Sequence, residues 1–381
     1  MARNHYTEMS TAEVVRVTTS RNELTAAKVP ALRELFRLER LPLAETRVEI
    51  ELRGVPTAVV NALRRVITDE LPGRCLQVPP DGFDVEKTTD GFMLPQFCNQ
   101  RIALLPLRPQ IPADIVDNLR LRLDAVNSGT SVLAVYAGDL EVVEGAMPEP
   151  LFNPTFKLAF LQPGKRLVIN GIRITTGYGR DDGAYIVARR AAYRHLDVPQ
   201  HSEAETHDIG GVAAEWSGYK VSSLVANPRH HVLTTSLPAT SANAAEARAV
   251  FVDACANIKG RLRLVGAAIE RRSEAPADSA AHPGPLAHSG VQYTVVQLQE
   301  GLSEGILRVP GETYTVGELL RRAVYDLVPD IVFVGYLVIA HENRLELTVR
   351  HTDDVARVLQ DAVRHCLADF DVIQRGISGA R

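Results

Sequence analysis

The sequence predicts an α+β protein built from two related units, with a β-rich insertion in the first unit. The first observation is a repeated motif: NALRRVITDELP at 61–72 and VGELLRRAVYDLVP at 316–329 align when Arg64 is laid on Arg321. Segments of alternating polarity, typical of half-buried strands, flank both copies. Each unit also ends in a long segment with an apolar stripe at helical spacing. Two such units would pair through these stripes about a pseudo-twofold axis.

The composition is that of a folded protein with substantial cores. Of 381 residues, 45% are apolar and 23% are charged, which favours two or three units over one small domain. A net charge of -4 argues against a surface that mainly wraps phosphate backbones, so direct nucleic-acid readout is not expected. The four cysteines are far apart, which argues against a disulfide framework or a structural zinc. Neither a secretion signal nor a membrane span is indicated, so we expect an intracellular location without membrane contact.

The first unit is expected to be discontinuous, with the ranges 45–109 and 215–271 forming one domain. Its strand from Arg47 places Val48, Ile50 and Leu52 on one face, and its long helix runs from Ala242 to Val265. Between the two ranges, 110–214 alternates in polarity and reads as an inserted β-rich domain. Residues 1–44 are expected to form an N-terminal extension with a short amphipathic helix around Leu32.

The second unit is expected at 291–381, after a flexible linker at 272–290 that is rich in Ala, Pro, Ser and Gly. Its pattern predicts the order β-β-α-β-β-α. Thr315 and Glu318 fit a capping box at the start of the first helix. The last helix, from about Asp353, carries a continuous apolar stripe on one side and charges on the other.

The apolar stripes define an expected interface between the two units. Its residues are spread over four helical segments, two in each unit, and each lies at core-facing spacing. They are Val59, Leu63, Val66, Phe251, Ile258, Leu320, Val324, Val355, Leu359, Val363, Leu367 and Phe370.

No segment indicates catalytic chemistry. The string ADFD at 368–371 supplies only Asp369 and Asp371, which diverge at i and i+2 on a helix, so a magnesium site is not expected there. GYGRDDG at 177–183 lacks the spacing of a phosphate-binding loop and favours a turn. An H-E-x-x-H motif does not occur in the sequence. We therefore expect no catalytic residue and no metal.

Two motifs carry a family resemblance. NALRRVITDELP followed by RIALLPL at 101–107 resembles the alpha-type chains of multisubunit RNA polymerases: bacterial alpha, archaeal D and the third-largest subunit of eukaryotic polymerase II. ETYTVGELLRRAV and FVGYLVIAHENRLELTVR resemble the small partner subunit, archaeal L or the eleventh subunit of polymerase II. Fusion of the two in one chain is similar to what nucleocytoplasmic large DNA viruses of eukaryotes encode. The positions that match the larger subunit's signature are Asn61, Leu63, Arg64, Arg65, Glu70, Pro72, Arg101, Leu104, Pro106 and Leu107.

The resemblance implies two alpha-amino-terminal-domain-like dimerisation units, paired as an intramolecular pseudo-dimer. It implies a non-catalytic scaffold, or assembly platform, of a DNA-directed RNA polymerase that acts in transcription. The implied partners are the second-largest and largest polymerase subunits, together with small polymerase subunits. A viral source implies the host nucleus or cytoplasm, and the virion if the complex is packaged. The expected partner-binding residues are Asn61, Arg64, Arg65, Arg101 and Arg321.

The insertion departs from the family pattern. The larger cellular subunit often carries a cysteine-rich metal-binding element there, whereas 110–214 contains no cysteine, so no cofactor is expected. Two alternatives remain open. A homo-oligomeric enzyme on the same α+β units would need clustered acids, bases or metal ligands. A nucleic-acid-binding module would bind DNA with an affinity that depends strongly on salt.

Overall fold

The structure is a computed structural model of the chain. It describes residues 11–23, 44–84, 86–88, 95–147, 150–188, 190–196, 228–238, 244–271, 290–298 and 301–379. The helix expected around Leu32 and nearly all of the expected linker lie outside these ranges. The described elements are helices and antiparallel sheets, which confirms the α+β class. In the described part of the chain, no helix is both long and apolar enough to cross a membrane.

A four-stranded antiparallel sheet forms the base of the first half. Val48, Ile50 and Leu52 are fully buried on one face of its second strand, because alternate residues of a strand point to opposite faces. The first strand comes from the segment expected to be an N-terminal extension. The strand order is β1 (Glu13–Glu23), β2 (Ala44–Arg53), β10 (His230–Pro238) and β9 (Arg190–His195).

Two helical segments follow strands of this sheet. Helix α2 (Thr57–Arg65) continues into a π-helical turn, η2 (Val66–Glu70), and buries its apolar stripe. Helix α5 (Ala244–Glu270) follows β10, close to the helix expected from the sequence. The apolar stripes of α2 and α5 belong to one continuous core.

The second half has the predicted order of elements. A sheet of four antiparallel strands carries one short and one long helix, α6 (Tyr314–Leu327) and α7 (Val355–Gly379). The capping box expected at Thr315 is not formed, since α6 begins at Tyr314 and Thr313 is its N-cap. The strand order is β11 (Gln292–Gln297), β12 (Ser303–Pro310), β14 (Arg344–His351) and β13 (Phe333–Ile339).

The two sheets have the same plan. The edge strands β1 and β9 of the first sheet correspond to the edge strands β11 and β13 of the second sheet. The central strands β2 and β10 correspond to the central strands β12 and β14. In both halves a short helix follows the second strand and a long helix follows the strand that pairs with it. The shift that lays Arg64 on Arg321 also lays the first residue of α2 on the first residue of α6.

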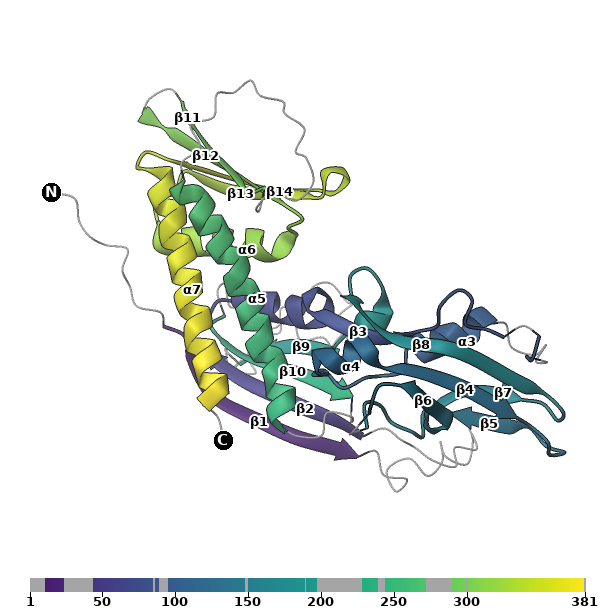
Figure 1. Ribbon diagram of the computed structural model, residues 1–381. Helices are drawn as coiled ribbons and strands as arrows, with labels where there is room; N and C mark the ends of the chain where they lie inside the picture. The colour runs from purple at the N-terminus through teal and green to yellow at the C-terminus, as the bar shows by residue number, and fades with distance from the viewer. Residues whose placement is uncertain are drawn as a thin grey trace, which may run out of the picture.

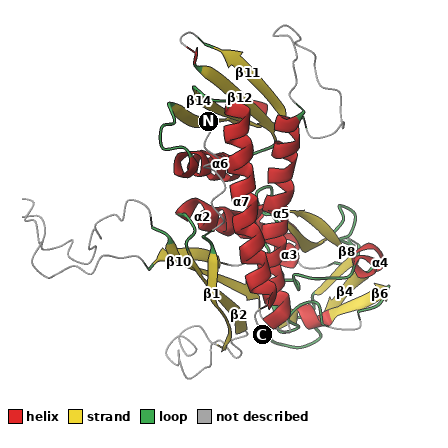
Figure 2. Cartoon of the chain, turned by 90° about the vertical axis from the view of Figure 1, so that its left-hand side faces the viewer, coloured by secondary structure: helices red, strands yellow, loops and turns green. Residues whose placement is uncertain are grey.

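The long helices connect the two sheets. Figure 1 shows α5 and α7 side by side between the β11–β14 sheet at the top and the β1–β2–β10 sheet below, and Figure 2 shows the same pair from the side. Each helix reaches the sheet of the other half, because α5 contacts β11 and α7 contacts β1. Eleven of the twelve expected interface residues are buried in this shared core, and Leu367 packs against it half-buried.

A separate lobe is inserted between η2 and β9, on the right in Figure 1. Its main sheet has the order β3 (Pro72–Gln77), β8 (Arg166–Tyr178), β4 (Arg120–Val126) and β6 (Leu140–Glu144). Strands β5 (Leu133–Tyr136) and β7 (Lys157–Leu161) pair beside it, and the short helices are α3 (Pro95–Ala103), α4 (Ala113–Asn118), η3 (Ala137–Asp139) and η4 (Gly183–Tyr185). The lobe has its own hydrophobic core.

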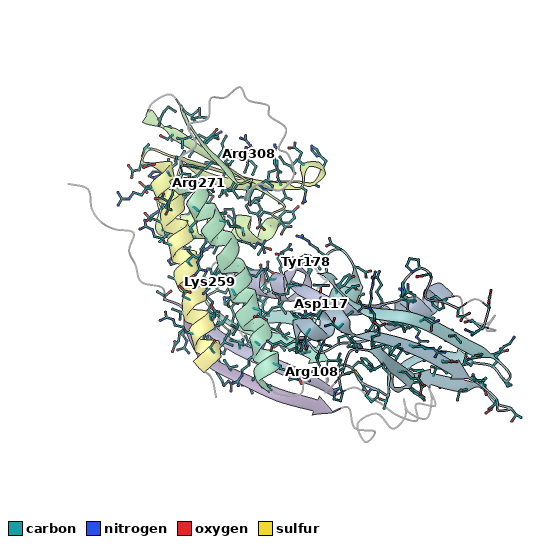
Figure 3. All side chains as sticks on the ribbon, in the orientation of Figure 1. Arg108, Asp117, Tyr178, Lys259, Arg271 and Arg308 are labelled. Atoms are coloured by element: carbon teal, nitrogen blue, oxygen red, sulfur yellow. The ribbon has the colours of Figure 1, made fainter. Side chains whose placement is uncertain are left out.

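The lobe is tied to the first half by an ion pair. Arg108 Nη2 donates to Glu246 Oε1 at the start of α5, and both side chains are largely buried. Arg108 is labelled at this junction in Figure 3. The turn after β8 also contacts η2, where the Arg180 amide donates to the Asp69 carbonyl at 3.1 Å.

Candidate docking surfaces and the contact between the halves

Helix α2 presents Asn61 and Arg64 at its partly exposed side. Val59, Ala62 and Leu63 face the core, so helical geometry turns the two polar residues away from it. Arg64 Nε donates to Asn61 Oδ1 at 3.0 Å, three residues earlier. The amide holds the guanidinium without neutralising it, which leaves a positioned positive charge.

Helix α6 presents the corresponding arginine in a different electrostatic state. Arg321 donates to Glu318 through Nε at 2.8 Å and Nη2 at 2.6 Å, and its guanidinium lies 5.4 Å from the ring centre of Tyr325. The hydrogen bond from Arg321 to Glu318 raises the pKa of Arg321. Because Glu318 stands where α2 has Asn61, this charge is already neutralised on its own helix. Each of the two arginines thus has a partner on its own helix.

Arg101 lies near the end of α3, on the lobe. The neighbours Cys98 and Ile102 are buried in the lobe core, so the opposite face of the helix is left outward. Phe97 is 57% exposed and Leu104 is 49% exposed, at i−4 and i+3 from Arg101. A positive charge between two exposed apolar side chains is the composition of a protein interaction surface.

Arg65 faces the second half. Its Nε donates to Thr315 Oγ1 at 3.0 Å, and Nη2 lies 3.7 Å from Glu70 Oε1. Thr315 in turn donates to Glu70 Oε1 at 2.8 Å. The hydroxyl expected to cap α6 is therefore engaged with the first half.

Arg261 on α5 is the centre of this contact. It donates to Glu70 through Nη1 and to both oxygens of Glu312, with a distance of 2.8 Å from Nε to Oε2. Glu70 is 7% exposed and Glu312 is 5% exposed. Burial acts to raise the pKa of Glu70, but the Arg261 charge and the Thr315 hydrogen bond outweigh it and hold that pKa below 4.5. Two buried carboxylates thus share one arginine across the halves.

A second ion pair joins the long helices. Lys259 Nζ on α5 donates to Asp371 Oδ1 on α7 at 2.6 Å, and Lys259 is labelled beside α7 in Figure 3. Sequence reasoning missed both Lys259 and Arg261. One signal was available, because Arg261 lies three residues after Ile258 and therefore borders the apolar stripe of α5.

The ADFD string does not assemble two carboxylates. Asp371 pairs with Lys259, whereas Asp369 is buried with its carboxylate 3.8 Å from His365 Nε2. Among the described residues, no group of three or more His, Cys, Asp or Glu side chains could hold a metal ion.

Matched sheets and paired long helices define an α+β protein with two linked halves. No family model matches the chain. The chain is 32% identical over 355 residues to the DNA-directed RNA polymerase RPB3-11 homolog of African swine fever virus, in the Vero-adapted Badajoz strain; the match covers 91% of this chain and 92% of the relative. A South African tick isolate and a Namibian warthog isolate have homologs with the same identity and coverage. The chain therefore belongs to the RPB3-11 homolog family and is an RNA polymerase subunit.

Proposed function

We propose that this chain is a non-catalytic assembly scaffold, on which the two large catalytic subunits of a viral DNA-directed RNA polymerase assemble. The observation that carries the proposal is the matched plan of the two sheets, with each long helix reaching the sheet of the other half. This arrangement supports an intramolecular pseudo-dimer of alpha-type units. The apolar seam, which is the shared core between the two halves, fixes the orientation of their outer faces relative to each other.

We propose that the lobe between the two ranges of the first unit begins at β3. Sequence alternation placed 45–109 in the first unit and 110–214 in the insertion. Strand β3 pairs with β8, however, and Leu76, Ile102 and Leu105 lie in the core of the lobe. Strand β9 pairs with β10 of the first sheet. These memberships support a lobe that spans 72–186, since Val187 and Ala188 pack in the core of the two halves.

Each half carries its own proposed docking surface. We assign Asn61, Arg64 and Arg101 to the second-largest subunit, and Arg321 to the face toward the largest subunit. Arg64 is the stronger candidate, because its guanidinium is held by a neutral amide and keeps its charge for a partner carboxylate. Arg65 is engaged with the second half, so we assign it to the internal contact. Small polymerase subunits complete the partner set, and the host nucleus, cytoplasm or virion is the site of action.

Affinity purification of the tagged full-length chain from cells that make it naturally tests the proposal. We expect two co-purifying chains above about 100 kDa and their loss from the Arg64→Ala chain, since truncating one member of a desolvated charge pair costs roughly 2–5 kcal/mol of docking energy. Arg364→Ala is the matched control, because Arg364 is exposed on α7 and pairs with Asp361. Recovery of the chain alone, or only with itself, would contradict the scaffold proposal.

A further inference from the structure

The two long helices correspond position by position. Laying Phe251 on Leu359 places every α5 residue of the shared core on a buried residue of α7. The apolar stripes are therefore alike, and by themselves they would let a half pair with its own kind. The other matched pairs are Ala247 with Val355, Val250 with Val358, Ala254 with Ala362, Cys255 with Val363, Ile258 with Cys366, Leu262 with Phe370, Val265 with Ile373 and Ile269 with Ile377.

The charged positions beside this seam are not alike. Arg261 of the first half falls on Asp369 of the second half. The shift that relates α2 to α6 places Glu312 on Val55 and Glu70 on Leu327. The cluster of Arg261, Glu70 and Glu312 therefore exists on one side of the pseudo-twofold axis and has no counterpart on the other side.

Pairing between two second halves would remove the cation from this cluster. Glu312 of one copy would then face Asp369 of the other copy, at the position that Arg261 occupies here. Both carboxylates are buried in the present structure, at 5% and 2% exposure. Two buried carboxylates would then meet without the arginine that pairs with Glu312 here, which is unfavourable.

Pairing between two first halves is opposed at the second ion pair. Asp371 falls on Arg263 under the same correspondence, so Lys259 of one copy would face Arg263 of the other. Arg261 would meet Val55 in place of Glu312, and the hydrogen bonds that Thr315 gives and receives would be lost because Ala58 stands at its position. Each like pairing thus replaces an attraction with a repulsion or an apolar contact.

We propose that the Arg261–Glu312 and Lys259–Asp371 ion pairs determine partner choice between the halves: each half accepts the unlike half and rejects its own kind. This selectivity rests on the proposed pairing of the two units and adds how that pairing excludes like halves. The apolar seam supplies contact area, and the two ion pairs supply the discrimination.

Two complementary full-length variants test the proposal. Arg261→Glu places three carboxylates together, and Glu312→Arg places two cations together, so each chain alone is mismatched across its own halves. When the two variants exchange halves reciprocally, the new glutamate meets the new arginine, and the unchanged Arg261 meets the unchanged Glu312. Co-expression with different tags should give a mixed dimer of about twice 41.7 kDa by light scattering, several-fold more abundant than when either variant is co-expressed with the unmodified chain.

Arg321→Glu and Glu318→Arg form the matched control pair. They carry the same charge changes in an ion pair that lies within α6, so exchange of halves cannot repair it and no mixed dimer is expected. The chain with both Arg261→Glu and Glu312→Arg should be monomeric. A mixed dimer no more abundant than in the control pair, or a doubly substituted chain that does not fold, would overturn the proposal. If the unmodified tagged chain is purified without polymerase subunits, that result would contradict the proposed function but not the selectivity between the halves.

Discussion

Helices α2 and α6 share a motif and differ in what surrounds it. In α2, Arg65 reaches across to Thr315, whereas the corresponding Arg322 stays on its own helix and lies 2.8 Å from Asp326. Glu70 ends the segment after α2 as a buried carboxylate, and Leu327 occupies the corresponding place in α6. A repeated helix can therefore keep its fold while its charged residues make different contacts in the two copies.

The same contrast applies to the whole interface. The apolar seam is common to both halves, so equivalent core residues should contribute alike. The ion pairs are particular to one side of the axis, so equivalent charged residues should contribute unequally. Three measurements test this contrast, in order of decreasing effect.

The largest effect is expected from Arg261→Ala. Removal of the guanidinium leaves Glu70 and Glu312 buried without a cation, which should lower the free energy of unfolding by about 3–5 kcal/mol. Arg322→Ala is the matched control, because the two arginine side chains are equally exposed, at 22% and 23%. The control should lose about 1 kcal/mol or less. Urea unfolding measures both, and equal losses would contradict the assignment of Arg261 to a special contact.

Leu63→Ala and Leu320→Ala should cost nearly the same. The two residues occupy corresponding positions in α2 and α6, and both are fully buried in the shared core. Each truncation should lower the free energy of unfolding by about 2–5 kcal/mol, through lost burial and the cavity left behind. Calorimetry or urea unfolding measures the losses. A large loss in one half and a negligible loss in the other would show that the seam is not common to both halves.

The smallest effect is expected in how the stability of the Glu70→Gln chain depends on pH. Because its pKa is lowered in the folded chain, Glu70 contributes stability that is fully present above about pH 4.5 and is lost as the pH falls through the folded pKa. Urea unfolding between about pH 3 and 7 should therefore show a shallower loss of stability on acidification in Glu70→Gln than in the unmodified chain.

Asp253 on α5 supplies a control of opposite sign. Asp253 is exposed on α5, but partial desolvation raises its pKa, so its contribution to stability falls as the pH rises above 3.8. Asp253→Asn should be more stable than the unmodified chain near neutral pH and lose that advantage in acid. Parallel pH profiles for the two variants would contradict the opposite environments of these carboxyls.

Local pattern was enough for the long helices and their buried faces. The stripe between Val355 and Phe370 predicted a long helix with a core-facing side, and the structure has both. The capping box at Thr315 was wrong because its hydroxyl bonds to Glu70, 245 residues away. The sequence pattern indicated no strand at 72–77, whereas the structure has β3 there, paired with β8.

The sequence by itself determined the long helices, the strands of the second half, the apolar stripes and the family, because periodicity and motif are properties of neighbouring residues. Only the tertiary structure decided which charges meet. Arg261 lies 51 residues from Glu312 and 191 residues from Glu70 along the chain, and no local spacing relates them. Packing of α5 against η2 and the start of α6 brings the three into one buried cluster, where the low exposure of the carboxylates makes the presence of the arginine essential.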